Sequence, residues 1–341
     1  MVANGDGYVF NPIKTKLKFL QASYIKYIHC SLVVWCAFFP FSKAVGLENS
    51  KTPKSISFPS MGISVNLFDT FTFSKKTSPF VRQCTYLGAP IGMFLYGVYF
   101  WEWSLGKQDY FSIKPETFIG SRAPNGGADK CGHMFANYAG TRFLTFMFRA
   151  TGSTKNKAII QGALLNDVTS FIGEIGDGFS MNYGFDPYDV LFNQFGVLLG
   201  MVLEYFPSLS RVFSMTWEYM PSKRLLHNLA HATKWDISTD YDAAKFMLTT
   251  KLCGIPSLSL TPLKYLNVDV GYYTRGYKHP EEYPSRTKNI FLGISINYSI
   301  ACEKVLPPGY CSSTLQSLFD YYHPWWDLEM KNWNISDIPH Q

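Results

Sequence analysis

An acid, an amine and an imidazole lie within one short stretch of the chain, GADKCGHMFANYAG, residues 127–140. They are Asp129, Lys130 and His133, and an apolar stretch with helical periodicity follows them. Residues four apart share one face of a helix, so Asp129 and His133 are expected to lie side by side. Such a pair can act in acid–base catalysis or bind a cation, whereas Asp129 alone could cap a helix start.

A second set of polar residues follows in GEIGDGFSMNYGFDPYDVLFNQFG, residues 173–196. Glu174 and Asp177 are three apart, and Asp189 and Asn193 are four apart, so each pair shares a helix face. A short loop joins the two pairs, which must therefore meet. The sequence predicts that these side chains converge with those near His133 at the ends of three helices.

Two interpretations of this cluster remain open. In the first, the catalytic residues are His133, Asp129, Glu174 and Asp177, and a divalent cation would bind to His133, Glu174 and Asp177. In the second, the acids and the histidine form a structural ion-pair network together with Lys130, Tyr138, Arg142, Asp189 and Asn193. No nucleophile motif is present, and buried ion pairs more often fix one arrangement than perform chemistry, which favours the structural network.

Three predicted helices carry these groups, and they span residues 129–150, 157–175 and 189–206. Each is apolar through its middle, as is typical of helices buried on most sides. Gly196 and Gly200 are four apart and would let another helix backbone approach. Residues 83–101 carry no charge and could either cross a bilayer or form a buried central helix.

Alternation of apolar and polar residues predicts β-structure at both ends of this helical region. Residues 62–74 have the pattern of a hairpin. Three further strands are predicted at 243–252, 265–277 and 289–299, and their apolar face could pack on the helices or face lipid. A surface helix with a loop is expected within 211–240, and a last helix at 312–322. The predicted fold is α+β, a bundle of about four apolar helices with an N-terminal β-hairpin and a C-terminal antiparallel sheet.

The chain divides into four parts on these features. A signal peptide or anchor (1–46) is followed by a linker and hairpin (47–82), the helical core with the polar cluster (83–208), and a part with a surface helix, antiparallel strands and a tail (209–341). The first part has lysines ahead of a short apolar stretch, and Ser42 and Ala44 fit a cleavage site. An uncleaved anchor is the alternative, and both imply export.

The composition points towards membrane contact. Charged residues make up only 16% of the 341 residues, below the usual quarter, while aromatic residues reach 17%. Aromatic rings favour the lipid–water interface, although an aromatic-rich core is the alternative. The expected partners are membrane lipid and other envelope proteins, and the absence of a nucleic-acid module predicts no nucleic-acid partner.

Two of the seven cysteines flank a turn-forming stretch. Cys302 and Cys311 could form one disulfide in an oxidising compartment, and two free buried thiols are the alternative.

The central block of the sequence resembles a known family. The segments ADKCGHMFANYAGTR and EIGDGFSMNYGFDPYDVLFNQFGVLLG are similar to the YfiM-like family of predicted periplasmic lipoproteins, a domain of unknown function. The family pattern falls on Asp129, Lys130, His133, Tyr138, Arg142, Glu174, Asp177, Gly178, Phe179, Ser180, Gly184, Phe185, Asp189, Asn193 and Gly196. The resemblance covers roughly residues 85–300, and a fainter one links the Asp-Lys-x-x-His stretch to the VanZ family of membrane proteins. It implies a location in the cell envelope, at the outer membrane or the periplasmic face, and no particular reaction.

Three functions follow as hypotheses. The preferred one is an envelope protein of a structural, assembly or lipid-associated kind, in which the polar cluster clamps the helix ends. The second is a metal-assisted hydrolase or transferase on a lipid or cell-wall substrate, which would use His133 and the carboxylates. The third is a module that binds lipid or a small molecule through its aromatic surface.

Overall fold

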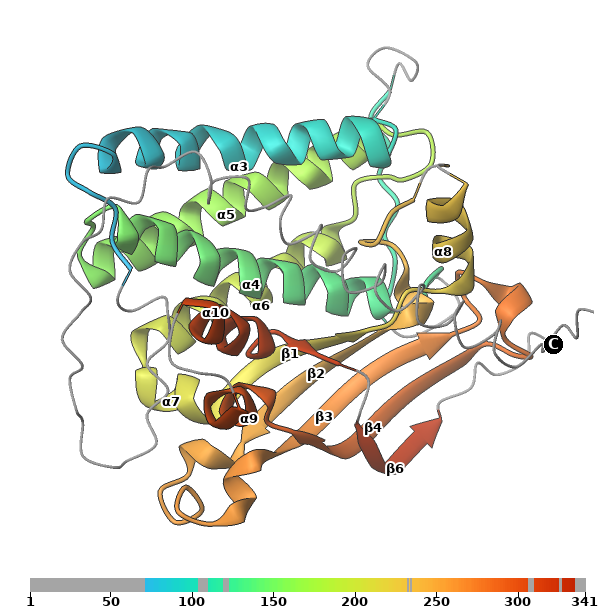
Figure 1. Cartoon of the computed structure of the whole chain (residues 1–341). Coiled ribbons are helices and arrows are strands. Elements are labelled where there is room, and N and C mark those ends of the chain that lie inside the picture. Colours follow the sequence, from blue (N-terminus) through green and yellow to red (C-terminus); the bar gives the residue numbers. More distant parts are fainter. Residues whose placement is uncertain are drawn as a thin grey trace, which may run out of the picture. The chain divides into compact units, whose positions relative to one another are not determined.

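The computed structural model describes residues 71–103, 110–118, 123–231, 233, 235–305, 310–324 and 327–334 (Figure 1). The predicted signal peptide or anchor lies outside this part of the chain. So does most of the predicted hairpin, and residues 71–74 belong to no helix or strand. The described residues combine helices with a mostly antiparallel sheet, which confirms the mixed fold class.

Four long helices form the first half of the described chain: α3 (Ser78–Phe100), α4 (Ala128–Ala150), α5 (Lys155–Gly178) and α6 (Pro187–Tyr205). Figure 1 shows them in succession above the sheet, from α3 through α5 to α4. Helix α4 packs against α5, α6 and strands of the sheet, so it is the central element. The predicted helices 129–150, 157–175 and 189–206 correspond closely to α4, α5 and α6.

Glycines allow α6 to approach α4 closely. A Cβ atom at Gly196 would overlap the carbonyl oxygen of Met134, and one at Gly200 would lie 3.1 Å from the carbonyl oxygen of Tyr138. The spacing of four keeps both glycines on the face that meets α4. The predicted small-residue face is therefore present, and it brings polar groups of α6 within reach of those on α4.

Helix α3 contains the uncharged stretch 83–101 and is peripheral. Only Val81 and Gly97 are buried in it, so the prediction of a buried central helix is wrong. Among the described residues, no helix combines the length and the apolarity needed to cross a bilayer.

The sheet has six strands in the order β5-β1-β2-β3-β4-β6. The predicted strands are confirmed as β2 (Ala244–Lys251), β3 (Leu266–Arg275) and β4 (Thr287–Ile296), and neighbouring strands are antiparallel except β1 and β5. Three strands were not predicted: β1 (Phe213–Tyr219), β5 (Tyr322–His323) and β6 (Leu328–Asn334).

Shorter helices surround the sheet. They are α7 (Pro207–Val212), α8 (Lys223–Ala230), α9 (Tyr298–Val305) and α10 (Tyr310–Phe319). A surface helix with a loop was predicted within 211–240, and α8 confirms the helix. The prediction did not include a strand there, so it is wrong for the residues of β1. The predicted last helix corresponds to α10. The third predicted strand ends at Ile296 rather than at 299, because α9 begins at Tyr298.

The two faces of the sheet differ in polarity. Met215, Tyr219 and Phe246 pack with Tyr138 of α4 in the main core, as expected for an apolar face against a helix. The opposite face carries polar side chains that are also buried, among them Thr216, Glu218, Thr249, Asp269 and Ser295. A solvated polar face is usual for an antiparallel sheet, so this buried polar face requires partners for its charged groups.

Candidate functional site

A completely buried lysine lies at the start of α4. The ammonium nitrogen of Lys130 lies 2.9 Å from Asp129 Oδ2, 2.6 Å from Asp186 Oδ2 and 2.8 Å from Asp189 Oδ1. Burial alone would lower the pKa of Lys130, but Asp129 and Asp189 outweigh it and raise the pKa above its usual value. Lys130 is therefore a permanent charge that joins the start of α4 to the start of α6.

His133 lies one turn further along α4 and faces two acids. Its Nδ1 is 3.0 Å from Asn193 Oδ1 and 3.4 Å from Glu174 Oε1, and its Nε2 is 3.5 Å from Asp189 Oδ1. Burial lowers the pKa of His133, but the acids, Asp189 foremost, raise it to about 9. The imidazole is therefore protonated at neutral pH, so it must lose a proton before it can act as a base or bind a metal.

Amide side chains connect the three helices below His133. Asn193 Nδ2 donates to Glu174 Oε1 at 2.9 Å, and Asn137 Nδ2 donates to Asn193 Oδ1 at 2.6 Å. Asn166 Nδ2 donates in turn to Asn137 Oδ1 at 2.8 Å. A buried network in which the polar groups are paired fixes how helices sit against one another. This chain of hydrogen bonds therefore holds α4, α5 and α6 in one arrangement.

The predicted acids lie near His133, but Asp189 lies closer to its imidazole than Asp177 does. His133, Glu174 and Asp189 place one ligand atom each within 4.8 Å of one another. Asp177, predicted as a metal ligand, instead accepts a hydrogen bond from Trp103 Nε1 at 2.7 Å. Burial raises the pKa of Glu174 to about 8 and that of Asp177 to about 7. The set closest to the imidazole therefore contains Asp189 in the place predicted for Asp177.

Tyr138 and Arg142 form a separate group. Arg142 Nε donates to Glu204 Oε1 at 2.8 Å, Nη1 donates to the Tyr138 hydroxyl at 2.8 Å, and Nη2 donates to Ser210 Oγ at 3.1 Å. Glu204 lies near the C-terminal end of α6, whereas Asp189 lies at its start. The nine residues predicted to form one cluster therefore form two groups. Tyr138 and Arg142 lie near the C-terminal end of α6, and the other seven lie near its start.

Four residues of the cluster were not predicted: Glu116, Asn137, Asn166 and Asp186. Asp186 is the N-cap of α6, since its Oδ1 accepts from the Tyr188 amide at 2.9 Å, and Pro187 follows it. An aspartate directly before a proline and an apolar helix is a sequence signal for such a cap. The third helix was predicted to begin at residue 189, two residues later than the observed start at Pro187, so Asp186 was left outside it. Glu116 Oε2 lies 3.5 Å from Lys130 Nζ.

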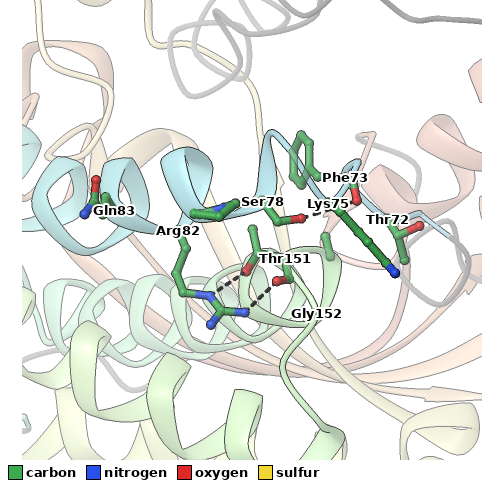
Figure 2. A pocket seen from close by; sticks show the side chains of 10 residues that line it. Thr72, Phe73, Lys75, Ser78, Arg82, Gln83, Thr151 and Gly152 are labelled. Carbon is green, nitrogen blue, oxygen red and sulfur yellow. Dashed lines mark hydrogen bonds between the residues drawn. The ribbon is translucent and has the colours of Figure 1, made fainter.

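The pocket in Figure 2 lies at the opposite end of α4. It has a volume of 510 Å³ and is lined by residues of α3 and of the turn after α4, including Arg82, Thr151 and Gly152. Arg82 Nη2 donates to the carbonyl oxygen of Thr151 at 2.5 Å across it. At 1.5 Å per residue, His133 and this turn are roughly 25 Å apart. The pocket is therefore not part of the polar cluster, which reaches the surface at His133, whose side chain is 26% exposed.

The disulfide prediction concerns residues far from this cluster. Cys302 forms no disulfide with any described cysteine, and the side chain of Cys311 lies outside the described part of the chain. The bridge between them stays a prediction.

No curated protein and no solved structure matches this chain. A family model does match residues 115–205. This segment contains α4, α5 and α6 and every residue described above as a partner of Lys130 or His133. The family's description supports an exported protein of the cell envelope and gives no activity. The helices that carry the cluster thus match a family described as predicted periplasmic lipoprotein (DUF2279).

Proposed function

We propose that this chain is a non-catalytic envelope protein that binds a lipid surface through α3, α5 and α6, and that its polar cluster is a structural clamp for these helices. The observation that carries the proposal is a stripe of exposed apolar side chains along each of the three helices.

The stripes follow helical periodicity. Along α5 the exposed residues are Ile160, Leu164, Val168, Phe171 and Ile175. Along α6 they are Tyr188, Leu191, Phe195, Leu198 and Val202, and along α3 they are Phe80, Leu87, Ile91, Leu95 and Tyr99. Steps of three, four or seven residues keep each series on one helix face, or nearly so. Helix α5 contacts both α3 and α6, so the stripes are neighbours.

Such a surface is unusual for a protein that contacts only water. Monomeric soluble proteins rarely expose contiguous apolar patches larger than a few hundred Å². The face contains several aromatic rings, which favour the lipid–water interface. Helix α3 adds a single charge, Arg82, in its first half. These features support lipid as the partner of this face, and the outer membrane or the periplasmic face as the location.

The arrangement of the polar cluster supports a clamp. Lys130 is fully enclosed and already pairs with four acids, of which Glu116 at 3.5 Å is the most distant. The imidazole of His133 is protonated, and its Nδ1 already faces Asn193 and Glu174. Buried charges of this kind are poor sources of net stability but can specify one arrangement of helices. A clamp keeps three apolar helices in register while their outer faces remain exposed.

Flotation with vesicles tests the lipid-binding part. Purified full-length protein is mixed with vesicles of phosphatidylethanolamine and phosphatidylglycerol and centrifuged through a density gradient. The wild type is expected to float. Leu164→Asp combined with Val168→Asp is expected to reduce the bound fraction at least tenfold, because each charge buried in lipid costs about 2.5–3.5 kcal/mol.

Leu260→Asp is the matched control, because Leu260 is 81% exposed but lies outside the helices of this face. It is expected to float like the wild type. Equal flotation of all three proteins, or no flotation of the wild type, contradicts lipid binding through this face.

A metal-assisted hydrolase or transferase is the alternative, and one observation favours it. His133, Glu174 and Asp189 have the spacing of a metal site, and His133 is partly exposed. His133→Ala separates the two functions: a clamp predicts a lower melting temperature, whereas a catalytic site predicts an unchanged melting temperature with a lost cellular phenotype.

A further inference from the structure

A second group of ionisable side chains lies on the buried polar face of the sheet. Asp269 on β3, His323 on β5 and Asp327 between β5 and β6 place one ligand atom each within 4.8 Å of one another. Asp269 is fully buried, and His323 is 2% exposed. One imidazole with two carboxylates is a donor set found at transition-metal sites.

Glu218 on β1 adds a third carboxylate to this group. It lies opposite His323 in the pairing of β1 with β5, and its carboxyl group is within hydrogen-bonding reach of that of Asp327. Glu218 is 8% exposed, and its Oε2 has no hydrogen-bond partner. Both carboxylate oxygens of Asp327 are likewise buried without a partner. Two buried carboxylates that face each other need a cation or a proton between them.

The nearby lysine does not satisfy these acids. Lys245 Nζ lies 3.2 Å from Glu218 Oε1 and 2.9 Å from Glu329 Oε1, so one positive charge is shared between two acids. Lys245 therefore leaves Glu218 Oε2 and both carboxylate oxygens of Asp327 without a donor.

The ligand atoms are held in place by a second layer of hydrogen bonds. The carboxylate of Asp269 accepts from Thr249 Oγ1 at 2.6 Å and from Ser295 Oγ at 2.5 Å. The Nδ1 atom of His323 lies 3.5 Å from the same Ser295 hydroxyl, so this hydroxyl borders both the imidazole and the carboxylate. Carboxylates and an imidazole that are held in place by neighbouring groups are what a metal site requires.

We propose that Asp269, His323, Asp327 and Glu218 bind one divalent transition-metal ion of the zinc or manganese class. Imidazole favours such ions over Mg²⁺ and Ca²⁺, which prefer sites built only from oxygen. Because its ligands are buried, the ion is structural. It ties β1, β3 and β5 to the chain that leads into β6, and its binding free energy adds to the stability of the sheet.

Metal titration of the full chain tests this site. Protein treated with a chelator is titrated with ZnCl₂ and with MnCl₂ in a calorimeter, and MgCl₂ serves as the comparison. One equivalent of Zn²⁺ or Mn²⁺ is expected to bind and to raise the melting temperature. Asp327→Asn and His323→Gln are each expected to weaken binding at least tenfold. His133→Gln is expected to leave this binding unchanged, which separates the sheet site from the cluster on α4.

Two results would overturn the proposal. The first is a wild-type protein that binds neither Zn²⁺ nor Mn²⁺, as expected if Glu218 and Asp327 share a proton instead. The second is binding that survives both substitutions in the sheet. If the variants do not fold, anomalous diffraction from zinc-soaked crystals of the unmodified protein decides the question. A peak between Asp269 and His323 supports the site, and no peak there contradicts it.

Discussion

Replacing Lys130 with methionine tests the structural clamp most directly. Methionine keeps most of the length of the side chain and removes its charge. The ammonium group of Lys130 lies within 3 Å of Asp129, Asp186 and Asp189. Its loss removes the cation that these three carboxylates share and leaves only the imidazole of His133, 3.5 Å from Asp189. The carboxylates must then repel one another or take up protons, and both outcomes cost stability.

The magnitude follows from the burial of the group. Removing one partner of a buried ion pair costs roughly 3–5 kcal/mol, because the other charge is left uncompensated in a poorly polarisable surrounding. For a domain of this size, 1 kcal/mol shifts the melting temperature by about 2–4 °C. Lys130→Met is therefore expected to lower the melting temperature by about 6–20 °C.

Thermal and urea unfolding followed by circular dichroism measure this change. Lys157→Met is the matched control, because Lys157 is exposed near the start of α5. A surface change of this kind is expected to alter the free energy of unfolding by less than about 0.5 kcal/mol. Asp189→Asn combined with Lys130→Met removes one of the carboxylates that has lost its lysine partner. The double variant is therefore expected to have a higher free energy of unfolding than Lys130→Met alone.

Two results would refute the clamp. One is a Lys130→Met variant as stable as the Lys157→Met control. The other is a double variant whose loss equals the sum of the two single losses, because independent sites add whereas partners in one network do not.

Two further predictions concern the same helices. The pKa of His133 in the folded state is raised to about 9, so its contribution to the free energy of unfolding is full below pH 6.5 and is lost as the pH rises through 9. Urea unfolding between pH 6 and 10 should show this fall in the wild type and a flatter profile in His133→Gln. Gly196→Ala should destabilise the protein by more than about 2 kcal/mol, because the new Cβ atom would overlap the carbonyl oxygen of Met134. Gly88→Ala on α3 is the control: its Cβ atom would meet open space, so this variant should stabilise the protein by about 0.5–1 kcal/mol. Similar unfolding midpoints for the two alanine variants would show that α6 does not approach α4 as closely as described.

Local sequence patterns predicted α4, α5 and α6 and the strands β2, β3 and β4, but not β1, β5 or β6. The helices are apolar through their middles, and β3 alternates apolar with polar residues over Leu266, Val268, Val270 and Tyr272. Strand β1 has the same signal, since Met215, Trp217 and Tyr219 alternate with polar residues, and it was overlooked beside the helical pattern of α8. Strand β6 was not predicted, because Leu328 and Met330 alternate with charged residues for only four positions and Trp333 falls out of that alternation.

The sequence by itself determined which side chains near His133 share a helix face, because a spacing of three or four residues sets that face whatever surrounds the helix. Only the tertiary structure decided that Asp186 and Asp189 face Lys130, that Asp177 turns to Trp103, and that Arg142 joins Glu204, because these contacts depend on how far α6 slides along α4. The acids of the sheet depend on it even more. Glu218, Asp269 and His323 come from three strands that are far apart in the sequence, and strand pairing alone makes them neighbours.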